Sequence, residues 1–339
     1  MNTEKMSETT QTKKNQLIFL LIKILSFLAI LYYILFVIDI NFVTVYNIFS
    51  STSFIYFFLL LFLFLVVEFI QAPIVTLLMR PYQVYIPPIQ VYQINLMSSL
   101  YSILPFGTIG GGIVRWYRLS KENKKRSEVF TVIILQRILS IIGLLFLGGI
   151  ILIFENPFGS DSEHYFFLYI MATVIFSVLI VSMAVLTSTF IMDFVDVKIV
   201  RPLLSKIPNS LSDKLNKLWI AVLGYKGNYK TLFISLLISI VYKIGVFFLY
   251  YFIIRLIGIE IAFLEIYGLY IAVSFVIEFV PIFGGIGFNQ AMFTGIYSLY
   301  DVPAEQAFTH SLVIQIFIIF IGGILEFYHQ FIRKKRKPC

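Results

Sequence analysis

Residues 53–79 read SFIYFFLLLFLFLVVEFIQAPIVTLLM and carry one charged side chain, Glu68. A run of about 20 apolar residues is long enough to cross a hydrocarbon core of about 30 Å as a helix. The whole chain of 339 residues shares this character, with 59% hydrophobic and 13% charged residues and a mean hydropathy of +0.92. Soluble domains contain roughly 25% charged residues. The composition therefore excludes a soluble enzyme, a disordered regulator and a disulfide scaffold, and predicts an all-α, polytopic bundle of membrane helices.

Five further runs of the same kind bring the expected number of full spans to about six. These runs are 17–38, 127–154, 165–192, 232–254 and 306–332. Two more apolar stretches, 85–112 and 266–298, are interrupted by Pro and Gly and are expected to be re-entrant. The membrane parts are then 17–192 and 231–332, joined by a connector at 193–230. Short tails at 1–16 and 333–339 complete the chain.

The distribution of charge predicts the orientation in the membrane. Of the 26 Lys and Arg residues, 22 lie in the two tails, in 80–126 and in 193–230, whereas the opposite loops are acidic and carry Arg255 alone. Basic residues in short loops stay in the cytoplasm. Both termini are therefore expected to be cytoplasmic in a multi-pass protein of the cell membrane. The net charge of +8 then reports topology, and no nucleic-acid partner is expected.

The connector contains an amphipathic pattern. Leu215, Leu218, Val222 and Leu223 recur at helical spacing after Ser210, with lysines between them. Such a helix lies on a membrane surface with its apolar face inward. We expect it on the cytoplasmic side, between the two halves; the alternative is a solvated loop.

Each half of the chain runs through two spans, one broken segment and a third span. The breaks are expected at Pro105, Gly107, Gly110, Gly111 and Gly112 in the first half, and at Pro281, Gly284, Gly285 and Gly287 in the second. If each broken segment enters and returns, each half crosses three times and the second half is inverted. Inverted repeats with interrupted helices are typical of alternating-access transporters, with the substrate near the breaks. The alternative is that the glycines only permit close helix packing.

The order of these residues resembles a known family. Leu104-Pro105, Gly110-Gly111-Gly112, Arg115, Gln136-Arg137-Ile138-Leu139, Pro281, Gly284-Gly285-Ile286-Gly287 and Gly322-Gly323 are similar to the lysylphosphatidylglycerol synthetase transmembrane-region family, a flippase-like group. The resemblance covers about residues 17–332. It implies a membrane region that moves an aminoacylated phospholipid across the bilayer. With about seven residues after the last span, we expect a stand-alone translocator without the soluble transferase domain.

This chain differs from the family pattern at two acidic positions. Gln136 stands where the family often has Glu before Arg137, and Gln290 follows Asn289 where the family has Gly-x-Gly-x-x-Glu. The resemblance therefore implies hydrogen bonding by amides at both places, so Gln136, Asn289 and Gln290 are candidate contacts to a lipid head group.

Ionisable side chains at membrane depth are expensive unless they are paired or hydrated, which makes each a candidate for function. Arg137 lies about ten residues into its span, and a guanidinium binds phosphate in a bidentate fork. Its alternative role is a structural pair with Glu68, Glu278 or Glu326. Arg115 and Arg118 follow the first break and are candidate head-group contacts; the alternative is ordinary cytoplasmic loop charge.

Four other ionisable residues are candidates for charge coupling: Glu278, Lys243, Glu68 and Glu326. Glu278 precedes Pro281 by three residues and either carries protons, balances Arg137 or caps a helix. Lys243 is expected to face a cavity or an acid. Glu68 and Glu326 lie near span ends, where an interfacial role is favoured over catalysis.

These features predict a translocator for an anionic or phosphate-linked lipid, such as an aminoacylated phosphatidylglycerol, a glycolipid or a polyprenyl-phosphate sugar. Two alternatives stay open: a membrane-embedded transferase or phosphatase, and an accessory subunit of a separately encoded lipid-modifying enzyme. No catalytic residues, metal site or cofactor are expected, because no His/Cys/Asp cluster or nucleophile motif occurs. The one cysteine is Cys339. The pattern does not predict the oligomeric state.

Overall fold

The computed structural model describes residues 41–51, 53–103, 107–123, 125–154, 177, 188, 193–205, 209–279, 285 and 287–329. Within these residues all regular secondary structure is helical. The elements in chain order are α2 (Phe42–Ser51), α3 (Phe54–Met79), η2 (Arg80–Tyr82), α4 (Pro88–Ser102), α5 (Gly107–Asn123), α6 (Arg126–Phe154), η3 (Asp196–Val200), α9 (Arg201–Leu204), α10 (Asn209–Leu223), α11 (Tyr229–Leu256), α12 (Phe263–Phe279), α13 (Phe288–Tyr297), η4 (Ser298–Tyr300) and α14 (Ala304–Phe327).

Among the described residues, four helices are long and apolar enough to cross a membrane: α3 with η2, α6, α11 and α14. They coincide with the expected spans 53–79, 127–154, 232–254 and 306–332. The other two expected spans, 17–38 and 165–192, lie outside the described residues. On α3, the exposed side chains Phe54, Phe58 and Phe62 form a stripe one turn apart. Such a stripe suits contact with lipid hydrocarbon, and it supports a membrane location.

Local sequence accounts for where several helices begin and end. Pro88 is the first residue of α4, a position whose backbone N–H has no helical partner in any case. At the end of α11, Gly258 has φ +80°, and the N–H of Ile259 donates to the carbonyl of Ile254 at 3.1 Å. This is the Schellman arrangement, for which glycine is the favoured residue.

The long helices pack closely around two large clusters of buried apolar side chains. α11 lies against α3 and α6, α14 lies against α4 and α13, and α12 lies against α6. Gly111 permits the contact of α5 with α4, and Gly322 permits that of α14 with α4, because a Cβ atom there would lie 2.9 Å from the Ser98 carbonyl oxygen and 2.8 Å from that of Leu96. Small residues at such crossings are typical of membrane helix interfaces.

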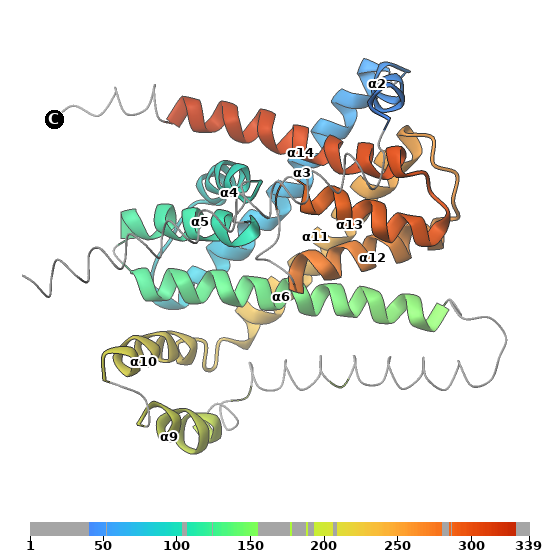
Figure 1. Ribbon diagram of the computed structural model, residues 1–339. Coiled ribbons are helices and arrows are strands. Elements are labelled where there is room, and N and C mark those ends of the chain that lie inside the picture. Colours follow the sequence, from blue (N-terminus) through green and yellow to red (C-terminus); the bar gives the residue numbers. More distant parts are fainter. Residues whose placement is uncertain are drawn as a thin grey trace, which may run out of the picture.

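The two halves of the described chain repeat the same order, with a long helix, a pair of shorter helices and a second long helix. The pair α4–α5 lies near one end of the bundle and the pair α12–α13 near the other (Figure 1). An inverted repeat stays a prediction that this arrangement favours.

The first break differs from the expectation. Gly107 is the first residue of α5, so Gly110, Gly111 and Gly112 are helical and the interruption precedes them. The physical reason is the close contact between α4 and α5 at Gly111. Glycine has no side chain there, so α5 can remain helical and still approach the backbone of α4 closely. Pro105 lies outside the described residues.

The second break agrees better with its glycines. Gly285 has φ +121° and Gly287 has φ +94°, between the end of α12 and the start of α13. Both values lie in the region that side-chain-bearing residues avoid. Pro281 and Gly284 lie outside the described residues.

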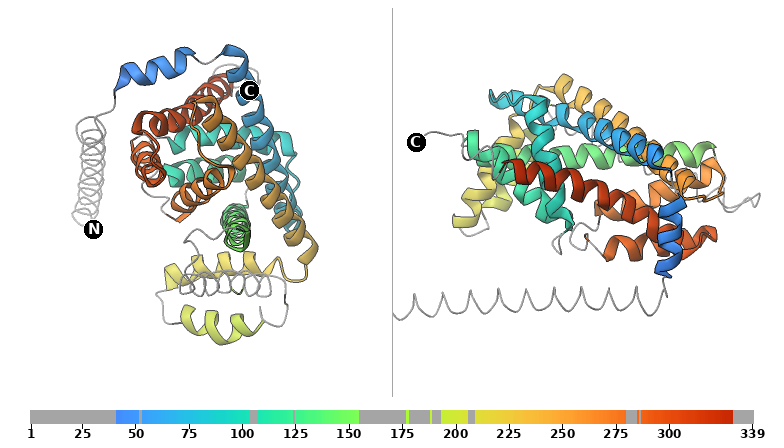
Figure 2. Two further views of the ribbon diagram at one scale, coloured as in Figure 1. Left: turned by 90° about the vertical axis from the view of Figure 1, so that its right-hand side faces the viewer. Right: turned by 90° about the horizontal axis from the view of Figure 1, so that it is seen from above.

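The connector contains the expected helix, α10, which lies beside α6 and outside the main bundle (Figures 1 and 2). Asp196 of η3 accepts hydrogen bonds from Trp219 at 2.8 Å and Arg201 at 3.0 Å, which joins α10 to η3 and α9. The Tyr225 hydroxyl donates to the Leu78 carbonyl at 2.6 Å, which connects the end of the connector to α3. Its position on a membrane surface stays a prediction.

Candidate functional site

A polar cavity of about 300 Å³ lies where helices of both halves meet. Its walls come from α3, α4, α5 and α6 of the first half and from α11 and α12 of the second. Its lining residues are mainly polar: Glu68, Gln71, Asn95, Ser98, Ser99, Ser102, Gly111, Gly112, Arg115, Gln136, Arg137, Ser140, Tyr242 and Glu278, with Ile133 and Ile277. We call it the central cavity. A polar cavity within an apolar helix bundle is a candidate site for a polar group.

Glu278 is the centre of a charged cluster at the end of α12. Its Oε1 accepts hydrogen bonds from Lys243 Nζ at 2.8 Å and Ser140 Oγ at 3.0 Å. Arg137 donates to the Glu278 carbonyl oxygen at 2.9 Å, and its Nε lies 3.8 Å from Oε2. The last carbonyls of a helix lack helical partners, so Arg137 caps α12. The structural pairing of Arg137 with Glu278, one of the alternatives that the sequence left open, is present.

Arg115 makes its side-chain hydrogen bond to an amide rather than to an acid, although Glu68 is near enough to interact with its charge. It donates to Gln136 Oε1 at 2.5 Å, and its buried Nε has no hydrogen-bond partner. Among the described residues no carboxylate lies within salt-bridge distance of its guanidinium. A buried unpaired donor on a permanent cation is a strong position for an incoming anion.

The remaining wall carries residues that the sequence analysis did not select. The Tyr242 hydroxyl lies 3.5 Å from Glu68 Oε1, and Asn95 Nδ2 lies 3.4 Å from Gln71 Oε1. Asn95 Oδ1 and Ser98 Oγ are buried without partners. The signal was available on α4, because Asn95, Ser98, Ser99 and Ser102 recur at helical spacing and form one polar face.

The cavity and its cluster hold an excess of positive charge. Arg115, Arg137 and Lys243 are cations, and Glu68 and Glu278 are acids, so the formal charge is one positive when all are ionised. The side chain of Lys243 is 8% exposed and that of Arg137 is 33% exposed. Arg137 and Arg115 therefore carry the positive charge at the cavity surface. Lys243 does not line the cavity and forms an ion pair with Glu278.

Arg118 and Glu326 form a separate pair outside the cavity. Arg118 Nη2 lies 2.6 Å from Glu326 Oε2, and the Tyr101 hydroxyl donates to Glu326 Oε1 at 3.1 Å. Both side chains are largely buried, between α5 and α14. The structure therefore does not bring Arg118 to the residues expected to bind the head group.

Gln290 and Asn289 lie at the second break rather than in the central cavity. Gln290 Oε1 accepts from the Gly287 backbone N–H at 2.6 Å, and its Nε2 donates to Gln315 Oε1 at 2.8 Å. Gln290 therefore ties the turn before α13 to α14. Asn289 lines a smaller cavity beside it.

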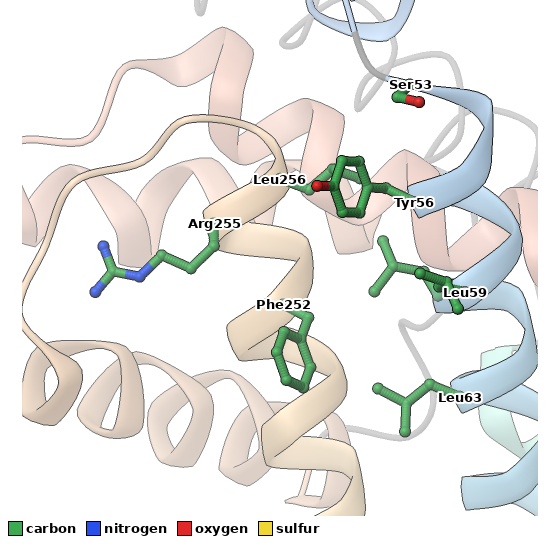
Figure 3. A pocket seen from close by; sticks show the side chains of 8 residues that line it. Ser53, Tyr56, Leu59, Leu63, Phe252, Arg255 and Leu256 are labelled. Atoms are coloured by element: carbon green, nitrogen blue, oxygen red, sulfur yellow. The ribbon is translucent and has the colours of Figure 1, made fainter.

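A larger cleft of about 670 Å³ lies between α3 and α11 and is mainly apolar. Tyr56, Leu59 and Leu63 extend from α3 toward Phe252 and Leu256 of α11 (Figure 3). Arg255 points away from these residues in the same view; its guanidinium stacks on Tyr251 with 5.4 Å between Cζ and the ring centroid, and donates to the Ile261 carbonyl at 3.0 Å. The cleft suits hydrocarbon, and the central cavity is the better site for charge.

Within the described parts of the chain, no group of three His, Cys, Asp or Glu residues is placed to hold a metal ion. No curated protein and no solved structure matches this chain. A sequence profile of the lysylphosphatidylglycerol synthase TM region matches residues 20–325. The match covers nearly all of the chain, including every residue that lines the central cavity. The chain is therefore a membrane protein that belongs to the lysylphosphatidylglycerol synthase transmembrane-region family.

Proposed function

We propose that this protein moves a phosphate-bearing lipid across the bilayer, with the polar head in the central cavity and the acyl chains in the surrounding lipid. The observation that carries the proposal is the excess positive charge beside a polar cavity inside an apolar bundle. A lipid phosphate supplies one negative charge and accepts several hydrogen bonds. The family ties the chain to lipid metabolism or translocation, in agreement with such a cargo.

Arg115 is the proposed primary phosphate contact, because its buried Nε has no partner. Arg137 is the second contact, reached only when it loosens from Glu278. The neutral side chains Asn95 and Ser98, each with an unpartnered buried oxygen, complete the polar wall. Movement of α4–α5 against α12–α13 would expose this wall to either side, as alternating access requires.

The test is the rate at which purified protein in phosphatidylcholine vesicles moves fluorescent phosphatidylglycerol between leaflets, measured by quenching from outside. Arg115→Ala should lower the rate by roughly 10- to 100-fold, since a hydrogen bond to a charged group contributes about 1.5–3 kcal/mol. Arg126→Ala is the matched control, because Arg126 is exposed at the start of α6 and outside the cavity.

Native mass spectrometry of co-purified lipids gives a second readout. One dominant phospholipid or lipid-linked sugar, lost in Arg115→Ala and kept in Arg126→Ala, supports the proposal. Equal transport by Arg115→Ala and the unaltered protein would reject the site. A specific bound lipid without any transport would favour the accessory-subunit alternative.

A further inference from the structure

A second, smaller cavity adjoins the central one, with a mainly apolar wall that carries a few polar side chains. It measures about 80 Å³ and lies where the tip of α13 meets α14, α11 and the end of α4. Its polar lining residues are Ser102, Tyr250, Asn289, Ser311 and Gln315. We call it the amide cavity. In contrast to the central cavity it has no charged lining residue.

Gln315, which lines the amide cavity, has a side-chain donor without a partner. Gln315 is 5% exposed, and its Oε1 already accepts from Gln290. Its Nε2 is buried and has no partner among the described residues. A buried amide N–H without an acceptor is costly, unless water or a ligand oxygen occupies the cavity. The volume suits two or three waters at about 30 Å³ each, or a group the size of a phosphate.

Two residues separate the cavities. Ser102, at the end of α4, and Ile277, near the end of α12, line both the central cavity and the amide cavity. They come from the two helix pairs that occupy opposite ends of the bundle (Figure 1). A side-chain movement at this point would join the two volumes into one polar path.

The position of Ile277 depends on the charged cluster. The next residue, Glu278, is held by Lys243 through its carboxylate and by Arg137 through its carbonyl oxygen. A phosphate in the central cavity would compete with Glu278 for Arg137 and so remove the cap from α12. Loading of the first cavity would then loosen the residue that closes the second.

From this arrangement we infer that the amide cavity is a second station for the phosphate or hydroxyl groups of the lipid head, closed from the central cavity by Ile277 and Ser102 while Arg137 and Lys243 hold Glu278. The inference rests on the proposed function. An uncharged second station binds an anion less strongly than the first and so favours its release.

The connection between the cavities can be measured without a lipid substrate. In a Cys339→Ser background, Asn289→Cys places a single thiol in the amide cavity. Membrane vesicles of both orientations are treated with an impermeant methanethiosulfonate reagent. Adding Ile277→Ala should raise the labelling rate by about tenfold in one orientation only, because a smaller side chain shifts the constriction toward its open state. Ile277→Trp should lower it.

Ile133→Ala is the matched control, because Ile133 lines the central cavity alone. Equal labelling rates in Ile277→Ala and Ile133→Ala would show that Ile277 does not separate the two cavities. Ile277→Trp tests the same point with a variant that leaves no void. Gln315→Leu then tests the station: it should slow phosphatidylglycerol transport several-fold while the amount of co-purified lipid is unchanged. Unchanged transport in Gln315→Leu would remove the station. If Ile277 variants alter labelling but the unaltered protein moves no lipid, the path stands and the proposed function fails.

Discussion

At the scale of single residues, the central cavity is characterised by the partners of its charged side chains. Glu278 serves two cations at once, through its carboxylate to Lys243 and through its carbonyl to Arg137. Arg115, by contrast, donates to an amide. This division follows from the amide at position 136, because a carboxylate there would form an ion pair with Arg115.

The Lys243–Glu278 pair predicts an asymmetric effect on stability. Glu278→Gln leaves the largely buried Lys243 without its acid and should cost about 3 kcal/mol, whereas Lys243→Met leaves Glu278 with Ser140 and Arg137 and should cost about 1 kcal/mol. The double variant Lys243→Met/Glu278→Gln should be more stable than Glu278→Gln alone. Unfolding by SDS titration in mixed micelles measures all three. Equal losses for the two single variants would contradict the assigned pairing.

At the scale of elements, two helices pack closely against α4, each at a glycine. Gly111 of α5 and Gly322 of α14 both face backbone carbonyls of α4, at Ser98 and Leu96. Arg118 and Glu326 join α5 to α14 beside the same helix. α4 also carries the polar face of the cavity. The contacts that position α4 therefore position half of the candidate site.

Adjacent glycines provide matched variants for this packing. Gly111→Ala and Gly322→Ala place a Cβ within 3 Å of an α4 carbonyl and should each cost about 1–3 kcal/mol of stability through overpacking. Gly112→Ala and Gly323→Ala meet nothing within 4 Å and should be neutral or slightly stabilising, since alanine favours helix by up to about 1 kcal/mol. SDS unfolding compares the two pairs. Equal losses for Gly111→Ala and Gly112→Ala, or for Gly322→Ala and Gly323→Ala, would show that the close approach is not what the glycines provide.

At the scale of the whole molecule, the pairs α4–α5 and α12–α13 lie at opposite ends of the bundle that the long apolar helices α3, α6, α11 and α14 traverse (Figure 1). From the distribution of charge we expect these two ends to lie on opposite sides of the membrane. Lys121 in the last turn of α5 and Glu260 between α11 and α12 are exposed at the two ends. Each is suitable as a position for a reporter.

This arrangement predicts opposite accessibility. In a Cys339→Ser background, Lys121→Cys should react with an impermeant thiol reagent only from the cytoplasmic side, and Glu260→Cys only from outside. Intact cells and inside-out vesicles supply the two measurements. Labelling of both cysteines from one side would refute both the expected orientation and the inverted arrangement of the halves.

The glycine-rich segments show where sequence reasoning was sufficient and where it was not. Gly285 and Gly287 have the backbone angles that a break needs, as their pattern predicts. Gly110, Gly111 and Gly112 are also glycines but are helical, and Gly111 among them makes the close contact with α4. Composition does not distinguish a turn from a close helix contact, because glycine occurs in both. Which of the two a glycine forms depends on the helix that packs against it.

The helical, membrane-spanning character of the chain follows from its sequence, because an uncharged run of sufficient length can satisfy its backbone in lipid only as a helix. The sequence also predicts which ionisable residues lie at membrane depth. The partners of those residues depend on the fold. Arg137 meets Glu278 across 141 residues and Arg118 meets Glu326 across 208. Such contacts depend on which helix faces pack together, and that packing leaves Arg115 without a salt-bridge partner among the described residues.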